Sequence, residues 1–307
     1  MTVRKKIIIG FGAFFSLFLV WYLLIKESDY VISFEVKTAT GTVFQGVQEW
    51  SAAQLVNQKE NYTTLEKRNF DFIKQEMKKG NVHMEYTWEM NSIDDSITSV
   101  TVGIKDLNNS LFNRFTAPFY NTSFKVEQIK KITDFKNGLN NYIKNFKVKI
   151  DGEGTSEETF VAYLKLTSVL QEKAQSMIAN NGIITGFLQQ NNIKIIGRPY
   201  LEIESWNLDK ETISFNYCFP IDKKAKIIEN ELVKFKTLPA IRGLKATYYG
   251  SFRTSDRAWF ALLDYAKEHD IKLDNKPLEH FLANPFNGGD ELKWEAKIII
   301  PFAKNKG

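Results

Sequence analysis

Two segments with the same ending carry the polar side chains best placed to contact a ligand. Asn216 lies four residues before Pro220, Lys297 lies four residues before Pro301, and Glu295 lies two residues before Lys297. An amide, an ammonium and a carboxylate can orient a small organic molecule by hydrogen bonds and charge. A carboxylate such as Glu295 could also activate water for hydrolysis.

Alternation predicts that both segments are strands with two different faces. Phe215, Tyr217 and Phe219 alternate with Asn216, and apolar residues likewise flank Lys297. Neighbouring strand residues point to opposite sides of a sheet. We therefore expect the apolar side to meet helices and the polar side to face away from them, as the floor of a cleft.

The elements that would position these strands occur twice in the same order. Each series predicts a strand, a helix and two further strands, and such self-similarity indicates a duplicated β-α-β-β module. The first series covers 159–167, 168–190, 199–206 and 211–221, and the second covers 244–250, 255–269, 278–284 and 291–302. A cleft between two such halves has the composition of a small-molecule site.

Other residues are expected to line the same cleft. Tyr249, Glu204 and Trp206 lie on predicted strands of the sheet, and Trp259 lies on the second helix, where it either closes the groove or packs in the core. Lys297 either lies at the pocket floor, where Glu295 could neutralise it, or extends from an edge into water.

Composition excludes several classes of protein. The chain has 307 residues, one cysteine and three scattered histidines, so we expect no disulfide framework, no metal site and no cofactor. A net charge of +5 without a basic block gives no sign of nucleic-acid binding. We assign no catalytic residue.

The N-terminus predicts a membrane anchor. The run from Ile7 to Ile25 has no charged residue, and basic residues precede it. It is just long enough to cross a bilayer, and the charge bias places its N-terminus in the cytoplasm. We expect residues 1–28 to form a single-pass anchor in the cytoplasmic (inner) membrane of a bacterium, with the soluble domains outside; the alternative is a cleavable signal peptide.

Residues 29–150 predict an α+β module that ends in a long helix at 122–146. Its VFQGVQEW stretch (43–50) and VHMEYTWEM strand (82–90), with the closing helix, resemble the helix-grip fold of the SRPBCC (START-like) superfamily. The polar, glycine-rich stretch 151–157 predicts a linker to a second domain at 158–307.

The second domain resembles the GyrI-like, or AraC-type, effector-binding domain over residues 157–303. GLKATYYGSF (243–252), SDRAWFALLDYAKEHDI (255–271), PLEHFLANP (277–285) and WEAKIIIPF (294–302) carry the resemblance, together with IKIIGRPYLEIESWN and ISFNYCFPI. It implies two β-α-β-β units (SHS2-type) around a groove for small, often apolar or cationic compounds. Some members hydrolyse electrophilic small molecules.

Two departures from that family change the expected ligand. Lys297 stands where the family usually has a buried glutamate, and Phe281 stands where it often has a tyrosine. An ammonium would favour an anionic or carbonyl-bearing compound. We therefore expect an anchored protein that binds a small organic molecule for sensing, sequestration or transfer. The alternatives are a hydrolase that uses Glu204 or Glu295, and a scaffold with closed cavities.

Overall fold

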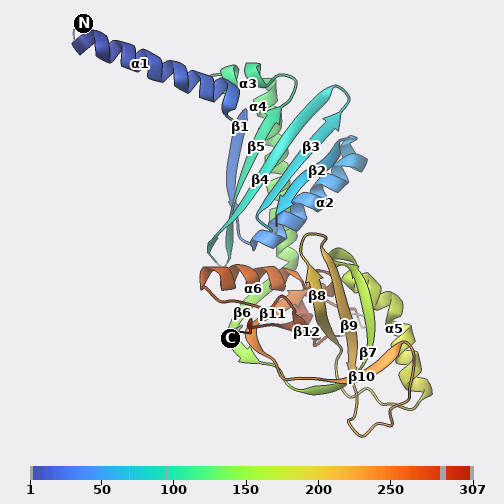
Figure 1. Ribbon diagram of the computed structural model, residues 1–307. Helices are drawn as coiled ribbons and strands as arrows, with labels where there is room; N and C mark the ends of the chain where they lie inside the picture. Colours follow the sequence, from blue (N-terminus) through green and yellow to red (C-terminus); the bar gives the residue numbers. More distant parts are fainter. Residues whose placement is uncertain (1–2, 69, 95, 284–287, 305–307) are drawn as a thin grey trace. The chain divides into compact units, whose positions relative to one another are not determined.

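The computed structural model describes residues 3–68, 70–94, 96–283 and 288–304 and has an α+β fold (Figure 1). It divides into two compact units. The first holds most of the chain up to residue 140, and the second holds the chain from residue 141 together with 37–42 and 92–97.

An apolar helix begins the described chain. Helix α1 (Val3–Val20) continues into the π-helical turn η1 (Trp21–Ile25). Within them, Lys6–Ile25 is long and apolar enough to cross a membrane, a property that anchors and signal sequences share.

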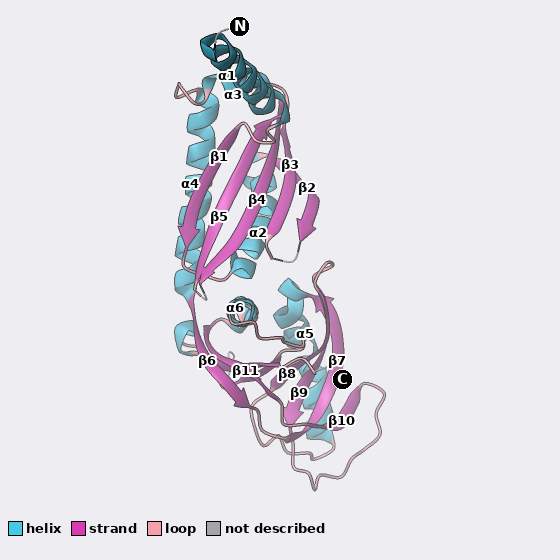
Figure 2. Ribbon diagram, turned by 60° about the vertical axis from the view of Figure 1, so that its left-hand side comes forward, coloured by secondary structure: helices cyan, strands magenta, loops and turns pink. Residues whose placement is uncertain are grey.

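The first unit contains a five-stranded antiparallel sheet, which Figure 2 shows with the long helix α4 beside it. In space the strands run in the order β1-β5-β4-β3-β2. The bounds are β1 (Tyr30–Val36), α2 (Thr40–Gln58), β2 (Asn61–Arg68), β3 (Phe72–Lys79), β4 (Val82–Asp94), β5 (Ile97–Asp106), α3 (Ser110–Thr116) and α4 (Ser123–Tyr142).

Aromatic side chains fill the space between this sheet and its helices. Trp50 of α2 and Phe135 of α4 both contact Trp88 of β4, with ring centroids 6.0 and 5.0 Å away. Both helices therefore pack on the same face of the sheet, and edge-on aromatic contacts of this kind stabilise such a core.

The second unit is built on an eight-stranded antiparallel sheet of order β10-β7-β9-β8-β12-β13-β11-β6. Strand, helix, strand, strand occurs twice along the chain, as β7-α5-β8-β9 and β11-α6-β12-β13. The bounds are β6 (Phe146–Thr155), β7 (Thr159–Val169), α5 (Lys173–Gln190), β8 (Tyr200–Asn207), β9 (Thr212–Pro220), β10 (Val233–Leu238), β11 (Arg242–Gly250), α6 (Arg257–Glu268), β12 (Leu278–Phe281) and β13 (Glu295–Pro301).

The stretch expected to be a linker is part of this sheet. Residues 151–155 belong to β6, which pairs with β11 along its length. Gly152, one of the glycines that suggested a break, serves the pairing instead: it has φ +85° at a bulge of β6, where Lys245 pairs with Gly152 and Ala246 pairs with Ile150. Asn284, the expected end of one strand, lies outside the described residues, and that strand ends at Phe281.

A buried ion pair joins the two helices of the second unit. Lys173, at the start of α5, is fully buried, and its Nζ lies 2.7 Å from Oδ1 of Asp256, the residue before α6. The same Nζ donates to the carbonyl of Arg253 at 3.2 Å, and Arg257 Nη1 lies 2.6 Å from Asp256 Oδ2. The two helix N-termini are thus held together by groups that have lost their water.

We predict that Lys173→Met destabilises the second unit by about 3–5 kcal/mol, because it leaves Asp256 buried without its ammonium partner. Lys165→Met is the matched control, since Lys165 forms an ion pair with Glu204 but its side chain is 61% exposed. That substitution should cost at most about 1 kcal/mol. Urea unfolding measures both, and equal losses would contradict the prediction.

Candidate functional site

The candidate site is a cavity of about 510 Å³ in the second unit. It lies between α5 and the sheet, because side chains of α5 and of β9 line it together. Ala174, Met177, Ile178, Asn181 and Thr185 come from α5; Tyr217 and Phe219 come from β9; Phe281 comes from β12, and Phe252 and Trp294 complete the aromatic wall. This volume is that of a pocket for a small organic molecule.

Weak packing by α5 explains why the space is open. The second helix, α6, buries a continuous set of apolar residues that includes Trp259, Phe260 and Leu262. In α5 the cavity side carries Met177 and Ile178 together with the smaller or more polar Ala174, Asn181 and Thr185. Such side chains do not fill the volume that a leucine or tryptophan stripe would fill.

A tyrosine and an amide form the polar point inside the cavity. Tyr217 Oη donates to Asn181 Oδ1 at 3.1 Å. Burial raises the pKa of Tyr217 to about 12, so the hydroxyl stays protonated at neutral pH. Because Oδ1 of Asn181 is used by the tyrosine, the amide has its two N–H donors left for a hydrogen-bond acceptor.

Charged residues contribute to the lining at its exposed edge. Arg198, Arg253 and Glu291 line the cavity, and all three are exposed. Two guanidinium groups against one carboxylate give this edge a positive balance. A ligand with an anionic or carbonyl group would meet complementary charge there.

A buried carboxyl lies behind the aromatic wall, on the same side of the sheet as Phe281. Glu279 is fully buried in β12, and its Oε2 accepts from Ser255 Oγ at 2.8 Å. Burial raises the pKa of Glu279 to about 7, against the opposing effect of the Lys173 ammonium. The pKa of nearby Asp256 moves the other way: burial pushes it up, but Lys173 and Arg257 outweigh burial and lower it.

Of the eight residues expected to bind a ligand, Phe281 lines the cavity. Two others lie on the same side of the sheet but do not line the cavity: Trp259 is fully buried, and its ring lies 5.3 Å from that of the half-buried Trp206. The expectation that the apolar side of β9 faces a helix is consistent with this arrangement, because Tyr217 and Phe219 share the cavity with α5.

The other five lie on the opposite side of the sheet, as the strand register shows. Asn216 Nδ2 donates to Glu204 Oε1 at 2.9 Å and to Glu202 at 2.7 Å. Lys297 Nζ lies 3.0 Å from Glu295 and donates to Thr247. Tyr249 pairs with Glu295 across strands β11 and β13.

Ion pairing on this side affects the carboxylates considered for hydrolysis. Glu204 lies 2.6 Å from Lys165, and this hydrogen bond, with that of Asn216, lowers its pKa. A carboxylate with a lowered pKa is a weaker general base. Glu295 pairs with Lys297, so the lysine's charge is largely neutralised.

Asn181, Arg198 and Arg253 are not among the site residues expected from the sequence, and alternation places Tyr217 on the strand side that meets the helices. One signal was available: the helix around Asn181 contains polar residues and two glycines where a packed helix would show an apolar stripe. Arg198 lies in a loop and Arg253 in the short 3-10 turn Phe252–Thr254, where periodicity gives no orientation.

Comparisons with known proteins give only distant similarities. No family model and no curated protein matches the chain. Among solved structures, the EcmrR C-terminal domain is 15% identical, with 52% of this chain and 98% of that chain covered, at a TM-score of 0.43. A hydrolase from Listeria innocua is 9% identical, with 50% and 92% covered, at a TM-score of 0.33. The di-domain ARO/CYC StfQ from the steffimycin biosynthetic pathway is 10% identical, with 89% and 85% covered, at a TM-score of 0.23. At these levels the matches assign neither family nor function.

We predict that the second unit loses stability as the pH rises through about 7. The protonated form of Glu279 is favoured in the fold, because its pKa lies well above the ordinary 4.5 of a glutamate. Its contribution is complete below the unfolded pKa and is lost as the pH passes the folded one, by an amount on the order of 3 kcal/mol.

Urea unfolding of wild type and Glu279→Gln at about pH 5 and about pH 8 measures this effect. The variant should remove most of the difference between the two pH values. Glu204→Gln is the control: the pKa of Glu204 is lowered, so its contribution is lost at acidic pH instead. An unchanged difference in Glu279→Gln would contradict the assignment.

Proposed function

We propose that this chain is a membrane-anchored protein that binds a small organic molecule in the cavity of its second unit, for sensing, sequestration or transfer. One observation carries the proposal: an aromatic-walled cavity of about 510 Å³ contains a hydrogen-bonded Tyr217–Asn181 pair. Apolar walls with a few oriented polar groups are the usual design of a ligand pocket.

The proposed ligand is a largely apolar, preferably aromatic molecule with one acceptor group. The rings of Phe252, Phe281 and Trp294 favour stacking with a flat compound. The amide N–H groups of Asn181 favour a carbonyl or carboxylate, and the two arginines at the edge favour the same group.

We further propose that the two β-α-β-β series of the second unit, β7 to β9 and β11 to β13, form a duplicated domain of the GyrI-like kind, and that the strands and helices of the first unit form a helix-grip-like module. The sheet order supports the duplication, because β7-β9-β8 in one half becomes β12-β13-β11 in reverse in the other. The quoted sequence stretches give the same interpretation independently.

We propose that α1 and η1 anchor the chain in the cytoplasmic membrane, with the N-terminus inside and both units outside. The uncharged run to Ile25 and the preceding Arg4 and Lys6 support this orientation. Trp21 and Tyr22 near the end of the run suit the outer interface of the bilayer.

The ion-paired face around Asn216 and Lys297 remains the competing location for the ligand. It has more charge than the cavity. Substitutions on the two faces can separate these locations, because they lie on opposite sides of one sheet.

We predict that Ile178→Trp weakens ligand binding about tenfold or more. Ile178 lines the cavity yet is 45% exposed, so an indole there can occupy the entrance without disturbing the core. Lys297→Glu should leave the affinity within about twofold. Native mass spectrometry of the full chain for co-purified compounds, followed by titration of the compound found, measures both. Loss of binding in Lys297→Glu alone would show that the site lies on the polar face. Binding at the wild-type affinity in both variants would exclude both locations.

We predict that Asn181→Leu selectively weakens the binding of ligands that carry a hydrogen-bond acceptor. Loss of one hydrogen bond should cost about 0.5–1.5 kcal/mol, or roughly two- to tenfold in affinity. A pair of aromatic compounds that differ only in a carboxylate or carbonyl group provides the comparison. If the variant weakens the binding of both compounds equally, Asn181 does not contact the acceptor group.

A further inference from the structure

Helix α3 and the residues that follow it have their polar side inward and their apolar side outward. Asn113, Arg114 and Ala117 are buried, whereas five large apolar side chains are between 57% and 76% exposed: Leu111, Phe112, Phe115, Phe119 and Tyr120. A helix on a water-facing surface shows the reverse distribution. Exposed apolar clusters of this kind mark interaction sites.

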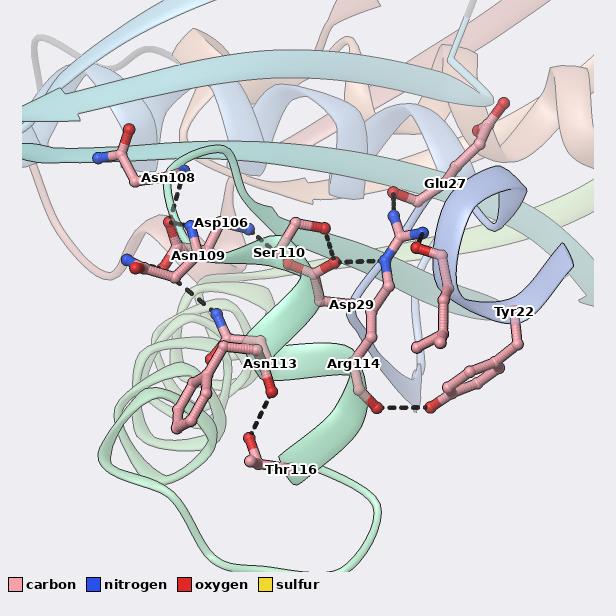
Figure 3. Close-up of polar contacts among 12 residues, drawn as sticks. Tyr22, Glu27, Asp29, Asp106, Asn108, Asn109, Ser110, Asn113, Arg114 and Thr116 are labelled. Carbon is pink, nitrogen blue, oxygen red and sulfur yellow. Dashed lines mark hydrogen bonds and ion pairs between the residues drawn. The ribbon is translucent and has the colours of Figure 1, made fainter. Parts of the chain in front are cut away.

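The buried arginine of α3 is bound to the end of the apolar N-terminal helix (Figure 3). Arg114 Nε lies 2.8 Å from Asp29 Oδ1, and both side chains are almost completely buried. Its Nη1 donates to the carbonyl of Leu23 at 3.0 Å, and its Nη2 donates to that of Glu27 at 3.2 Å. The guanidinium thus satisfies two carbonyls where the helix ends.

Further hydrogen bonds fix α3 in the same place. Asp29 Oδ1 also accepts from Ser110 Oγ at 2.5 Å, and Asp29 Oδ2 accepts from the backbone N–H of Asp106 at 2.8 Å. Tyr22 Oη donates to the carbonyl of Arg114 at 3.1 Å. Ser110 and Arg114 of α3 are therefore bound to residues 22–29, and the apolar side chains of α3 are left facing outward near the end of the apolar run.

We propose that Leu111, Phe112, Phe115, Phe119 and Tyr120 insert into the outer interface of the bilayer beside the anchor helix. This inference rests on the proposed membrane anchor and adds a second, shallower contact with lipid. A lipid surface is the favoured occupant because α3 packs against η1, which contains Trp21 and Tyr22, the aromatic residues at the distal end of the uncharged run. Phenylalanine and leucine on one side of a short helix are the residues that enter the headgroup boundary.

The cluster would restrict how the first unit stands on the membrane. A single helix followed by a flexible segment permits free rotation, whereas two contacts held together by a buried ion pair do not. Arg114 acts here as a positioning residue: it contacts no lipid, but it holds α3 at the depth of the helix end.

Spin labels on the full chain test the proposal. The single native cysteine, Cys218, is buried and can be replaced by alanine, so that labels attach only to introduced cysteines at Phe15, Phe115, Phe119 or Leu65. Leu65 is the matched control, because it is a similarly exposed apolar residue on β2 of the same unit. The protein is reconstituted in phosphatidylcholine–phosphatidylglycerol vesicles, and collision rates with oxygen and with a water-soluble nickel complex are measured.

Labels at 115 and 119 should show a severalfold higher oxygen-to-nickel ratio than the label at 65, and a lower ratio than the label at 15. A ratio at 115 and 119 equal to that at 65 would overturn this inference while the deep label at 15 still supports the anchor. A water-exposed label at 15 would instead overturn the anchor itself. Low collision rates with both reagents would indicate burial by a protein partner or a second copy, and would also overturn the proposal.

Arg114→Gln tests the positioning role separately. With the label at 115, the oxygen-to-nickel ratio should fall toward the control value, while the labels at 15 and 65 remain unchanged. If Arg114→Gln changes the oxygen-to-nickel ratio at position 65, the substitution has disturbed the unit as a whole. The double variant Phe112→Ser/Phe119→Ser is then measured in its place. Those exposed residues can change without loss of packing, and the ratio at 115 should again fall. An unchanged ratio in these variants would overturn the inference.

Discussion

The second unit depends on a buried ion pair between the starts of its two helices. Lys173 and Asp256 are separated by 83 residues in the chain, yet their charged groups lie 2.7 Å apart with almost no exposure. Removing the carboxylate leaves the buried ammonium without its counter-ion, and removing the ammonium leaves Asp256 with Arg257 alone, so the pair constrains both helices together. Because Lys173 also binds the carbonyl of Arg253, this constraint reaches the segment that lines the cavity.

The same sheet serves two different purposes on its two sides. On one side, charges pair with one another across intervening strands: Lys165 of β7 pairs with Glu204 of β8, and Lys236 of β10 pairs with Glu202 of β8. On the other side, apolar strand residues meet helices, and the cavity opens where α5 leaves volume unfilled. Enclosure by aromatic walls makes the second side more suitable for holding a molecule, although the first has more functional groups.

The sequence predicts the helices and strands of this fold better than it predicts which of their residues line the cavity. The apolar run to Ile25 and the alternation around Asn216 predict an apolar helix and a two-faced strand, because both patterns are local. The cavity depends instead on how well α5 fills the space above β9, which is a tertiary property of Tyr217 and Asn181. The bond between Asp29 and Arg114 joins residues 85 positions apart, and no periodicity reveals such a pair. The glycines at 152 and 154 led to the wrong prediction of a linker, because glycine occurs both in breaks between elements and within strands.

The difference between the two helices explains why a pocket can persist in a folded unit. A dry void of about 510 Å³ would cost on the order of 10 kcal/mol at roughly 24 cal/mol per Å³, which is comparable to the entire stability of a domain. Such a space is tolerable when it opens to solvent, as it does beside the exposed Arg198 and Arg253. Water next to the rings of Phe252 and Phe281 finds few hydrogen-bond partners, so its displacement by an apolar ligand is favourable. Beneath α6 the corresponding space is filled by Trp259 and its neighbours. Both halves therefore wall the cavity, and the space that binding requires opens on the side of α5.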